Sequence, residues 1–112
     1  MTEQQIIETL ATKVMGWSTK SKQSSFWLDF EGHLRPKRSW NPLQNIADAW
    51  QVVEQIKKDG FDVQIYRGQG FTSVEIIESS QGMIIGEYEG VTTQESICHA
   101  ALRVFAADLT QR

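Results

Sequence analysis

Aromatic and basic residues are interleaved between residues 17 and 40, and together these residue types could bind a flat, charged ligand. Three tryptophans and five basic residues occur there: Trp17, Trp27, Trp40, Lys20, Lys22, Arg35, Lys37 and Arg38. Aromatic rings stack on nucleobases, while guanidinium and ammonium groups bind phosphates. The segment therefore predicts a site for a small nucleotide-derived ligand. The alternative is a basic loop that closes over the core, with its rings as core side chains.

The residues predicted to bind this ligand are Trp27, Arg35, Lys37, Arg38, Trp40 and Arg67. Arg67 comes from a later segment, Arg67-Gly68-Gln69-Gly70, which superficially suggests a phosphate-binding loop. The segment lacks the Lys-Ser/Thr pair and the following helix of a P-loop. Glycine supplies positive φ in tight hairpins, so a turn explains these residues better.

A second group with chemical potential is Asp29, Glu31 and His33. Alternate residues of a strand project from one face, so two carboxylates and a base could gather as a weak hydrolase or a weak metal site. The alternative is a solvated hairpin edge whose charges discourage aggregation. The motifs of common hydrolases and nucleotide-binding enzymes do not occur in the sequence. We therefore expect a binding protein that is not an enzyme and uses no cofactor.

Cysteine and histidine offer little further chemistry. Cys98 is the single cysteine, and His33 and His99 are the two histidines, too few for a typical structural zinc site. Cys98 and His99 are adjacent on a predicted helix, where neighbours point in different directions. We therefore expect a structural pair and no metal.

The elements that must position these residues follow from periodicity and turn signals. We expect a helix over residues 2–15, opened by a Thr2/Gln5 capping box and closed by Gly16. Residues 26–29 and 34–35 should form a hairpin around a turn at 30–33. A second helix should start at Asn41-Pro42 and run to Lys58, with an apolar stripe of Ile46, Ala49, Trp50, Val53 and Ile56.

The last half of the chain reads as a sheet followed by a helix. Strands at 61–66, 71–78 and 83–89 have connections that are short enough only for an antiparallel meander. Glu75, Glu78, Glu87 and Glu89 should be staggered on its solvent face, because directly opposed like charges destabilise a sheet. A third helix should run from Thr92 to about Leu109. Its apolar residues cover more than one stripe, so we expect a homo-oligomer formed through this C-terminal helix.

Length and composition bound the class of protein. The chain has 112 residues, and we expect a single domain over 1–112. The lone cysteine, and a start unlike a signal peptide or a membrane span, predict a cytoplasmic location. The net charge is −3, with six basic and four acidic residues in 1–40 against five and ten in 41–112. This acidity disfavours nucleic acid as a partner.

Three stretches resemble the phage ABA sandwich family: residues 10–17 (LATKVMGW), 41–50 (NPLQNIADAW) and 96–102 (SICHAAL). The resemblance implies a helix/sheet/helix sandwich, in agreement with the α+β order α-β-β-α-β-β-β-α read from the residues. It also implies a phage or prophage accessory protein acting on host defence. Together with the basic, aromatic segment this predicts sequestration of a nucleotide-derived signal in the bacterial cytoplasm. The alternatives are a module that inhibits a host protein, and a weak hydrolase.

Overall fold

A computed structural model describes residues 1–21 and 23–106. In chain order the helices and strands are α1 (Glu3–Thr9), a π-helical turn (Leu10–Val14), β1 (Phe26–Leu28), β2 (Leu34–Pro36), a 3-10 turn (Lys37–Ser39), α2 (Ile46–Lys58), β3 (Phe61–Gly68), β4 (Phe71–Glu78), β5 (Met83–Gly90) and α3 (Thr93–Phe105). The predicted α+β fold class and the predicted order of elements are confirmed.

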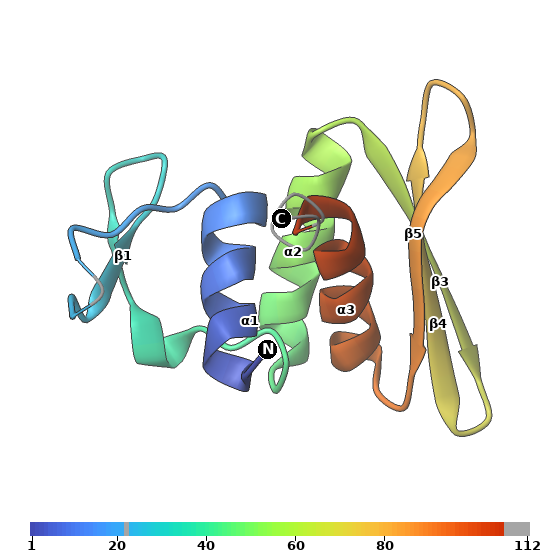
Figure 1. Cartoon of the computed structure of the whole chain (residues 1–112), viewed down its shortest axis with the longest axis horizontal. Coiled ribbons are helices and arrows are strands. Elements are labelled where there is room, and N and C mark those ends of the chain that lie inside the picture. Colours follow the sequence, from blue (N-terminus) through green and yellow to red (C-terminus); the bar gives the residue numbers. More distant parts are fainter. Residues whose placement is uncertain (22, 107–112) are drawn as a thin grey trace.

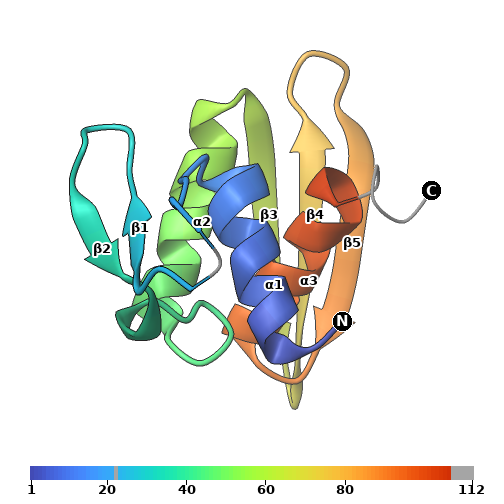
Figure 2. The same cartoon turned by 60° about the vertical axis from the view of Figure 1, so that its left-hand side comes forward.

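The elements are layered along the longest axis of the molecule (Figure 1). β1 and β2 form an antiparallel hairpin at one end, and β3, β4 and β5 form an antiparallel meander at the other. Between them lie α1 on the hairpin side and α2 and α3 against one face of the meander, as the rotated view also shows (Figure 2). The opposite face of the meander faces solvent in the described part of the chain.

The first helix begins and ends where predicted, but its last turn is π-helical. Thr2 accepts a hydrogen bond from the Gln5 backbone N–H, and the Gln5 side chain accepts one from the Thr2 N–H. After Thr9 the helix widens into a π-helical turn, and the Met15 N–H then donates to the Leu10 carbonyl. Gly16 follows at φ 71° and leads the chain away from the helix axis.

The second helix starts four residues later than predicted. Asn45 is the N-cap, accepting a hydrogen bond from the Asp48 N–H. Asn41 instead accepts hydrogen bonds from the N–H groups of Leu43 and Gln44, and so closes the turn before the helix. An Asn-Pro pair suits a turn as well as a helix start, and here it forms the turn.

The buried stripe of α2 is also shifted from the predicted one. It consists of Ala49, Val52, Val53 and Ile56, which keep the helical spacing. Trp50, predicted to lie in the core, is 44% exposed, and Ile46 is exposed as well. Trp50 instead points to the side of the helix that faces the hairpin turn, where it lines a cleft with Phe30.

The last helix is covered by other parts of the same chain. α3 contacts β4, β5, α2, α1 and the π-helical turn. Its buried Ser96 donates a hydrogen bond to the Thr72 carbonyl on β4, at 2.9 Å. The broad apolar surface of α3 is therefore explained by packing within one chain and does not require a second copy. The predicted end of this helix near Leu109 lies outside the described residues.

The meander presents an apolar face to the helices and an acidic face to solvent. Val74 and Ile76 on the central strand are buried beneath α3 and α2. The register places Glu75 directly opposite Glu87 on the other face, contrary to the expected stagger. The cause is an irregularity between Ile76 and Ile77, because an unbroken register from the turn would place Gly86 opposite Glu75. Among the described residues, no helix is both long and apolar enough to cross a bilayer.

Gly86 lets α3 lie close to β5, and this contact gives the first prediction. A Cβ at Gly86 would overlap the Val104 side chain and lie 3.2 Å from the Ala100 carbonyl oxygen. Gly86→Ala should therefore lower the free energy of unfolding by about 1–3 kcal/mol, measured by urea denaturation. Glu87→Ala, on the solvent face of the same strand, is the control and should change it by no more than about 0.5 kcal/mol. Equal effects of the two changes would contradict this packing.

Candidate functional site

The three tryptophans between residues 17 and 40 are core residues. Trp17, Trp27 and Trp40 are all buried, and Trp27 is only 2% exposed. The rings of Trp17 and Trp40 meet edge to face with centroids 4.8 Å apart. The Trp40 Nε1–H donates to Gln51 Oε1 on α2 at 2.8 Å. These rings join the hairpin segment to the helices, so Trp27 and Trp40 do not form the open stacking surface expected from the sequence.

Two of the predicted cations rest on these buried rings. The Arg35 guanidinium lies 4.9 Å from the centroid of the Trp17 ring, and its Nε–H donates to Asp29 Oδ2 at 3.0 Å. The Lys37 ammonium lies 4.5 Å from the centroid of the Trp27 ring. Cation–π contact of this kind holds a charged group in place without neutralising it. Lys37 is thus a positioned and still charged group.

A cleft of about 490 Å³ opens beside Lys37, and we call it the basic cleft. Its lining residues are Gln4, Ser24, Ser25, Phe26, Pro36, Lys37 and Arg38. They come from α1, from the loop before β1 and the first residue of β1, and from the end of β2 with the 3-10 turn. The volume lies in the range typical of small-molecule sites. None of the lining side chains is acidic.

The structure brings together only part of the predicted set. Lys37 and Arg38 line the basic cleft, and Trp27 lies beneath Lys37. Arg35 and Trp40 do not line it. Arg67 lies on β3, in the meander at the other end of the molecule (Figure 1). Lys22 lies outside the described residues.

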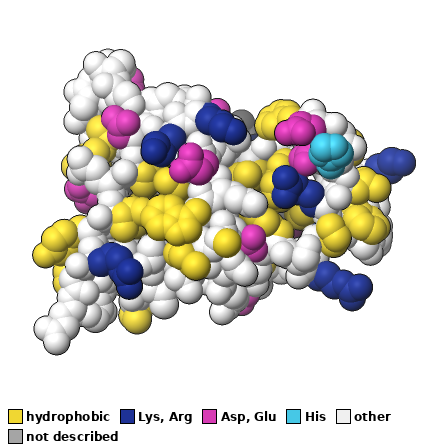
Figure 3. Space-filling view, turned by 180° about the vertical axis from the view of Figure 1, so that it is seen from behind, with side chains coloured by type: hydrophobic (Ala, Val, Ile, Leu, Met, Phe, Trp, Pro, Cys, Tyr) yellow, Lys and Arg dark blue, Asp and Glu magenta, His cyan; other side chains and the backbone are white. Residues whose placement is uncertain are grey.

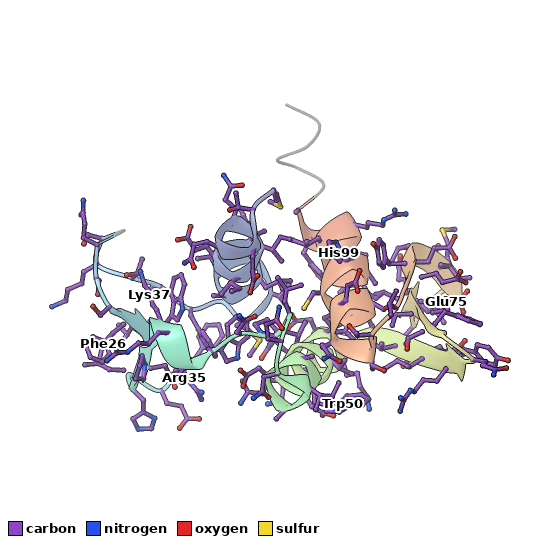
Figure 4. The ribbon with its side chains drawn as sticks, turned by 90° about the horizontal axis from the view of Figure 1, so that it is seen from below. Phe26, Arg35, Lys37, Trp50, Glu75 and His99 are labelled. Atoms are coloured by element: carbon purple, nitrogen blue, oxygen red, sulfur yellow. The ribbon has the colours of Figure 1, made fainter. Side chains whose placement is uncertain are left out.

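Phe26 is the aromatic lining residue that the sequence pattern did not predict, and four further lining residues were also not predicted: Gln4, Ser24, Ser25 and Pro36. Phe26 is 43% exposed and belongs to the basic cleft, whereas its neighbour Trp27 is buried. Successive residues of a strand point to opposite faces, so a buried Trp27 requires an outward Phe26. Figure 4 shows Phe26, Arg35 and Lys37 together at the hairpin end, with Trp50 on α2. The alternation along the strand could have predicted Phe26, but the prediction placed the ring of Trp27 outward in its place.

Asp29 stabilises the turn of the hairpin and is not arranged for catalysis. Its Oδ1 accepts hydrogen bonds from the N–H groups of Glu31 and His33, at 3.0 and 2.9 Å, and its Oδ2 accepts from Arg35. His33 Nδ1 lies 3.9 Å from Asp29 Oδ2 and 3.8 Å from Glu31 Oε2. The side chains of His33 and Glu31 are mostly exposed. In the described chain, no three His, Cys, Asp or Glu side chains are grouped to hold a metal ion.

Cys98 and His99 do not form a nucleophile and base. Burial raises the pKa of the Cys98 thiol to about 12, so the thiol stays protonated at neutral pH. The His99 ring stacks on Tyr88 of β5, with centroids 4.6 Å apart. Figure 4 shows His99 on α3, away from the residues of the basic cleft. The pair is structural, as the sequence predicted.

The hydrogen bonds of Asp29 predict how the hairpin responds to acid. The His33 N–H, and then Arg35 and the Glu31 N–H, lower the pKa of this carboxyl below its usual value, against the opposing effect of burial. The ionised group therefore stabilises the fold above the unfolded pKa of about 3.9, and this contribution is lost as pH falls through the lower folded pKa. The amide resonances of Glu31 and His33 should shift in that acid range.

Asp29→Asn should remove this acid transition from both amides, because it removes the titrating group while keeping the side-chain shape. Glu31→Gln, which replaces the exposed carboxyl of the same turn, is the matched control and should leave the transition in place. An unchanged transition in Asp29→Asn would show that another group controls the turn.

The comparison with known families agrees with the geometry. The phage ABA sandwich domain matches residues 8–102, which run from α1 into α3. No curated protein and no solved structure matches the chain. The matched span covers the hairpin, the meander and the tryptophans that join the hairpin to the helices, and it confirms the resemblance carried by the three sequence stretches. The chain belongs to the phage ABA sandwich domain family and is a small phage-associated protein.

Proposed function

We propose that this protein is a phage accessory factor that binds and sequesters a small nucleotide-derived anion in the basic cleft. The observation that carries the proposal is the composition of that cleft: two cations, two hydroxyls and one exposed aromatic ring, with no acidic side chain among the residues that line it. Phosphates require cations and hydrogen-bond donors, and a base requires a flat partner.

Five of the seven lining residues have a role in this proposal. Lys37 and Arg38 bind the phosphate oxygens, with Arg38 supplying the planar fork of donors and Lys37 a point charge held by the Trp27 ring. The hydroxyls of Ser24 and Ser25 donate further hydrogen bonds to the phosphates. The half-exposed ring of Phe26 stacks on the base.

The same residues favour binding over turnover. The side chains that line the basic cleft include no carboxylate, imidazole or thiol that could transfer a proton or attack phosphorus. The ligand is therefore held and released unchanged. In a phage-associated protein, sequestration of a nucleotide signal would lower the free concentration of that signal and so weaken a host defence that depends on it.

Calorimetry against a panel of cyclic dinucleotides and ADP-ribose derivatives tests the proposal. At least one member should bind, and Lys37→Ala combined with Arg38→Ala should weaken that binding by about 100-fold or more, because two charge-assisted contacts are lost. The bound ligand should be recovered intact by chromatography.

Arg67→Ala is the matched control, since it removes an exposed cation from the meander end. It should leave the affinity within about twofold of wild type, because charges beyond a Debye length are screened. Failure of every panel member to bind would end the proposal. Equal losses from the Arg67 variant and the Lys37/Arg38 variant would place the ligand elsewhere.

A further inference from the structure

The hairpin carries an uncovered apolar face at one end of the molecule. Its register pairs Phe26 with Pro36 and Leu28 with Leu34, and we call these four residues the hairpin outer face. Trp27 and Arg35 alternate with them and face the helices. Leu34 is 65% exposed, and Phe26 and Leu28 are also exposed. Exposed apolar patches of this kind often mark interaction surfaces.

Positive charge surrounds this apolar face. Lys20 lines a hollow of about 330 Å³ together with Phe26, Leu28 and Leu34. Arg38 lines the basic cleft together with Phe26 and Pro36, whereas the Lys37 ammonium lies over Trp27 on the opposite face of the hairpin. Within residues 1–21 and 23–106, ion pairs occur only in the hairpin turn, so Lys20 and Arg38 have no carboxylate partner there. Figure 3 shows hydrophobic and Lys/Arg side chains side by side at this end, on the right of that view.

The solvent face of the meander has the complementary character. We call it the outer meander face, and its residues are Asp62, Gln64, Tyr66, Phe71, Ser73, Glu75, Ile77, Ile84, Glu87 and Glu89. It combines four carboxylates with the rings of Tyr66 and Phe71 and two isoleucines, and has no lysine or arginine. Glu75 stands directly opposite Glu87, an arrangement that destabilises an isolated sheet and that a cationic partner would relieve.

We infer that this protein self-associates head to tail, with the hairpin outer face of one copy on the outer meander face of the next. Two sheet faces can pack against each other through their side chains. In that contact Leu34 meets the apolar side chains of the meander, while Lys20 and Arg38 approach Glu75 and Glu87. Both partners in this charge complementarity are supplied by the same chain.

The geometry sets the kind of assembly. The two faces are different surfaces and lie at opposite ends of the long axis (Figure 1). A contact between unlike surfaces is heterologous, and it produces rings or open chains instead of a closed two-fold dimer. The hairpin outer face shares Phe26 and Pro36 with the basic cleft, but Leu28 and Leu34 do not line that cleft, so the inference does not rest on the proposed ligand.

Sedimentation velocity with two single-face variants tests the inference without any ligand. Leu34→Glu damages the hairpin outer face, and Glu87→Lys damages the outer meander face. Wild type should exceed the monomer mass of 12.8 kDa increasingly with concentration and less so at high salt. Each variant alone should weaken association by about tenfold or more. Ile46→Glu, at an exposed isoleucine on neither face, is the control and should behave as wild type.

The mixture of the two variants is the decisive sample. Each variant retains the face that the other lacks, so an equimolar mixture should form a one-to-one heterodimer that cannot grow. Heterodimer formation also shows that both variants are folded. A wild type that stays monomeric at all concentrations overturns the inference. So does a Glu87→Lys variant that assembles like wild type, or a mixture that contains only monomers.

Discussion

Three buried indole rings hold the hairpin against the helices, and every feature at that end of the molecule depends on this packing. A two-stranded hairpin is only marginally stable by itself. Each indole buries roughly 150–250 Å² of surface. At about 25 cal/mol per Å² this corresponds to about 4–6 kcal/mol per ring, before the entropy of ordering the hairpin is subtracted. The Trp27 N–H is buried without a hydrogen-bond partner in the described chain, so this ring contributes through packing and its contact with Lys37.

The position of the charges follows from the rings. Arg35 and Lys37 lie over Trp17 and Trp27, and Asp29 completes the arrangement by binding both the turn and Arg35. The rings turn Trp27 inward and thereby turn its strand neighbour Phe26 outward. One packing arrangement thus creates both the charged lining of the basic cleft and the apolar surface beside it. Asp29 forms an ion pair with Arg35. Among the described residues, Lys37 and Arg38 form no ion pair, so both can bind a ligand or a partner.

Local signals in the sequence predicted the elements, and long-range contacts decided the rest. The caps at Thr2 and Thr92 and the alternation in the meander are local, and the structure confirms them. Local signals did not predict that Trp50 is exposed while the other three tryptophans are buried. Two stripes on α2, one with Trp50 and one with Val52, both have helical spacing, and contacts with distant elements select the second.

The candidate site was predicted only in part, because its lining depends on contacts between segments that are distant in the sequence. Lys37 and Arg38 were recognised from residue type, and the basic cleft contains both. The contribution of Gln4 to the lining requires that α1 lie beside the hairpin, which no local pattern reveals. The opposition of Glu75 and Glu87 depends on one irregularity in the β4–β5 register. Sequence spacing alone therefore favoured a staggered arrangement.

Quenching of tryptophan fluorescence by acrylamide in a Trp50→Phe variant tests the central claim most directly. This variant removes the one exposed indole and leaves Trp17, Trp27 and Trp40 as the only emitters. The account predicts emission at the short wavelengths of buried indole, with quenching several-fold weaker than for free tryptophan. Emission and quenching close to those of free tryptophan would contradict it, because the hairpin would then lack the packing that positions the basic cleft.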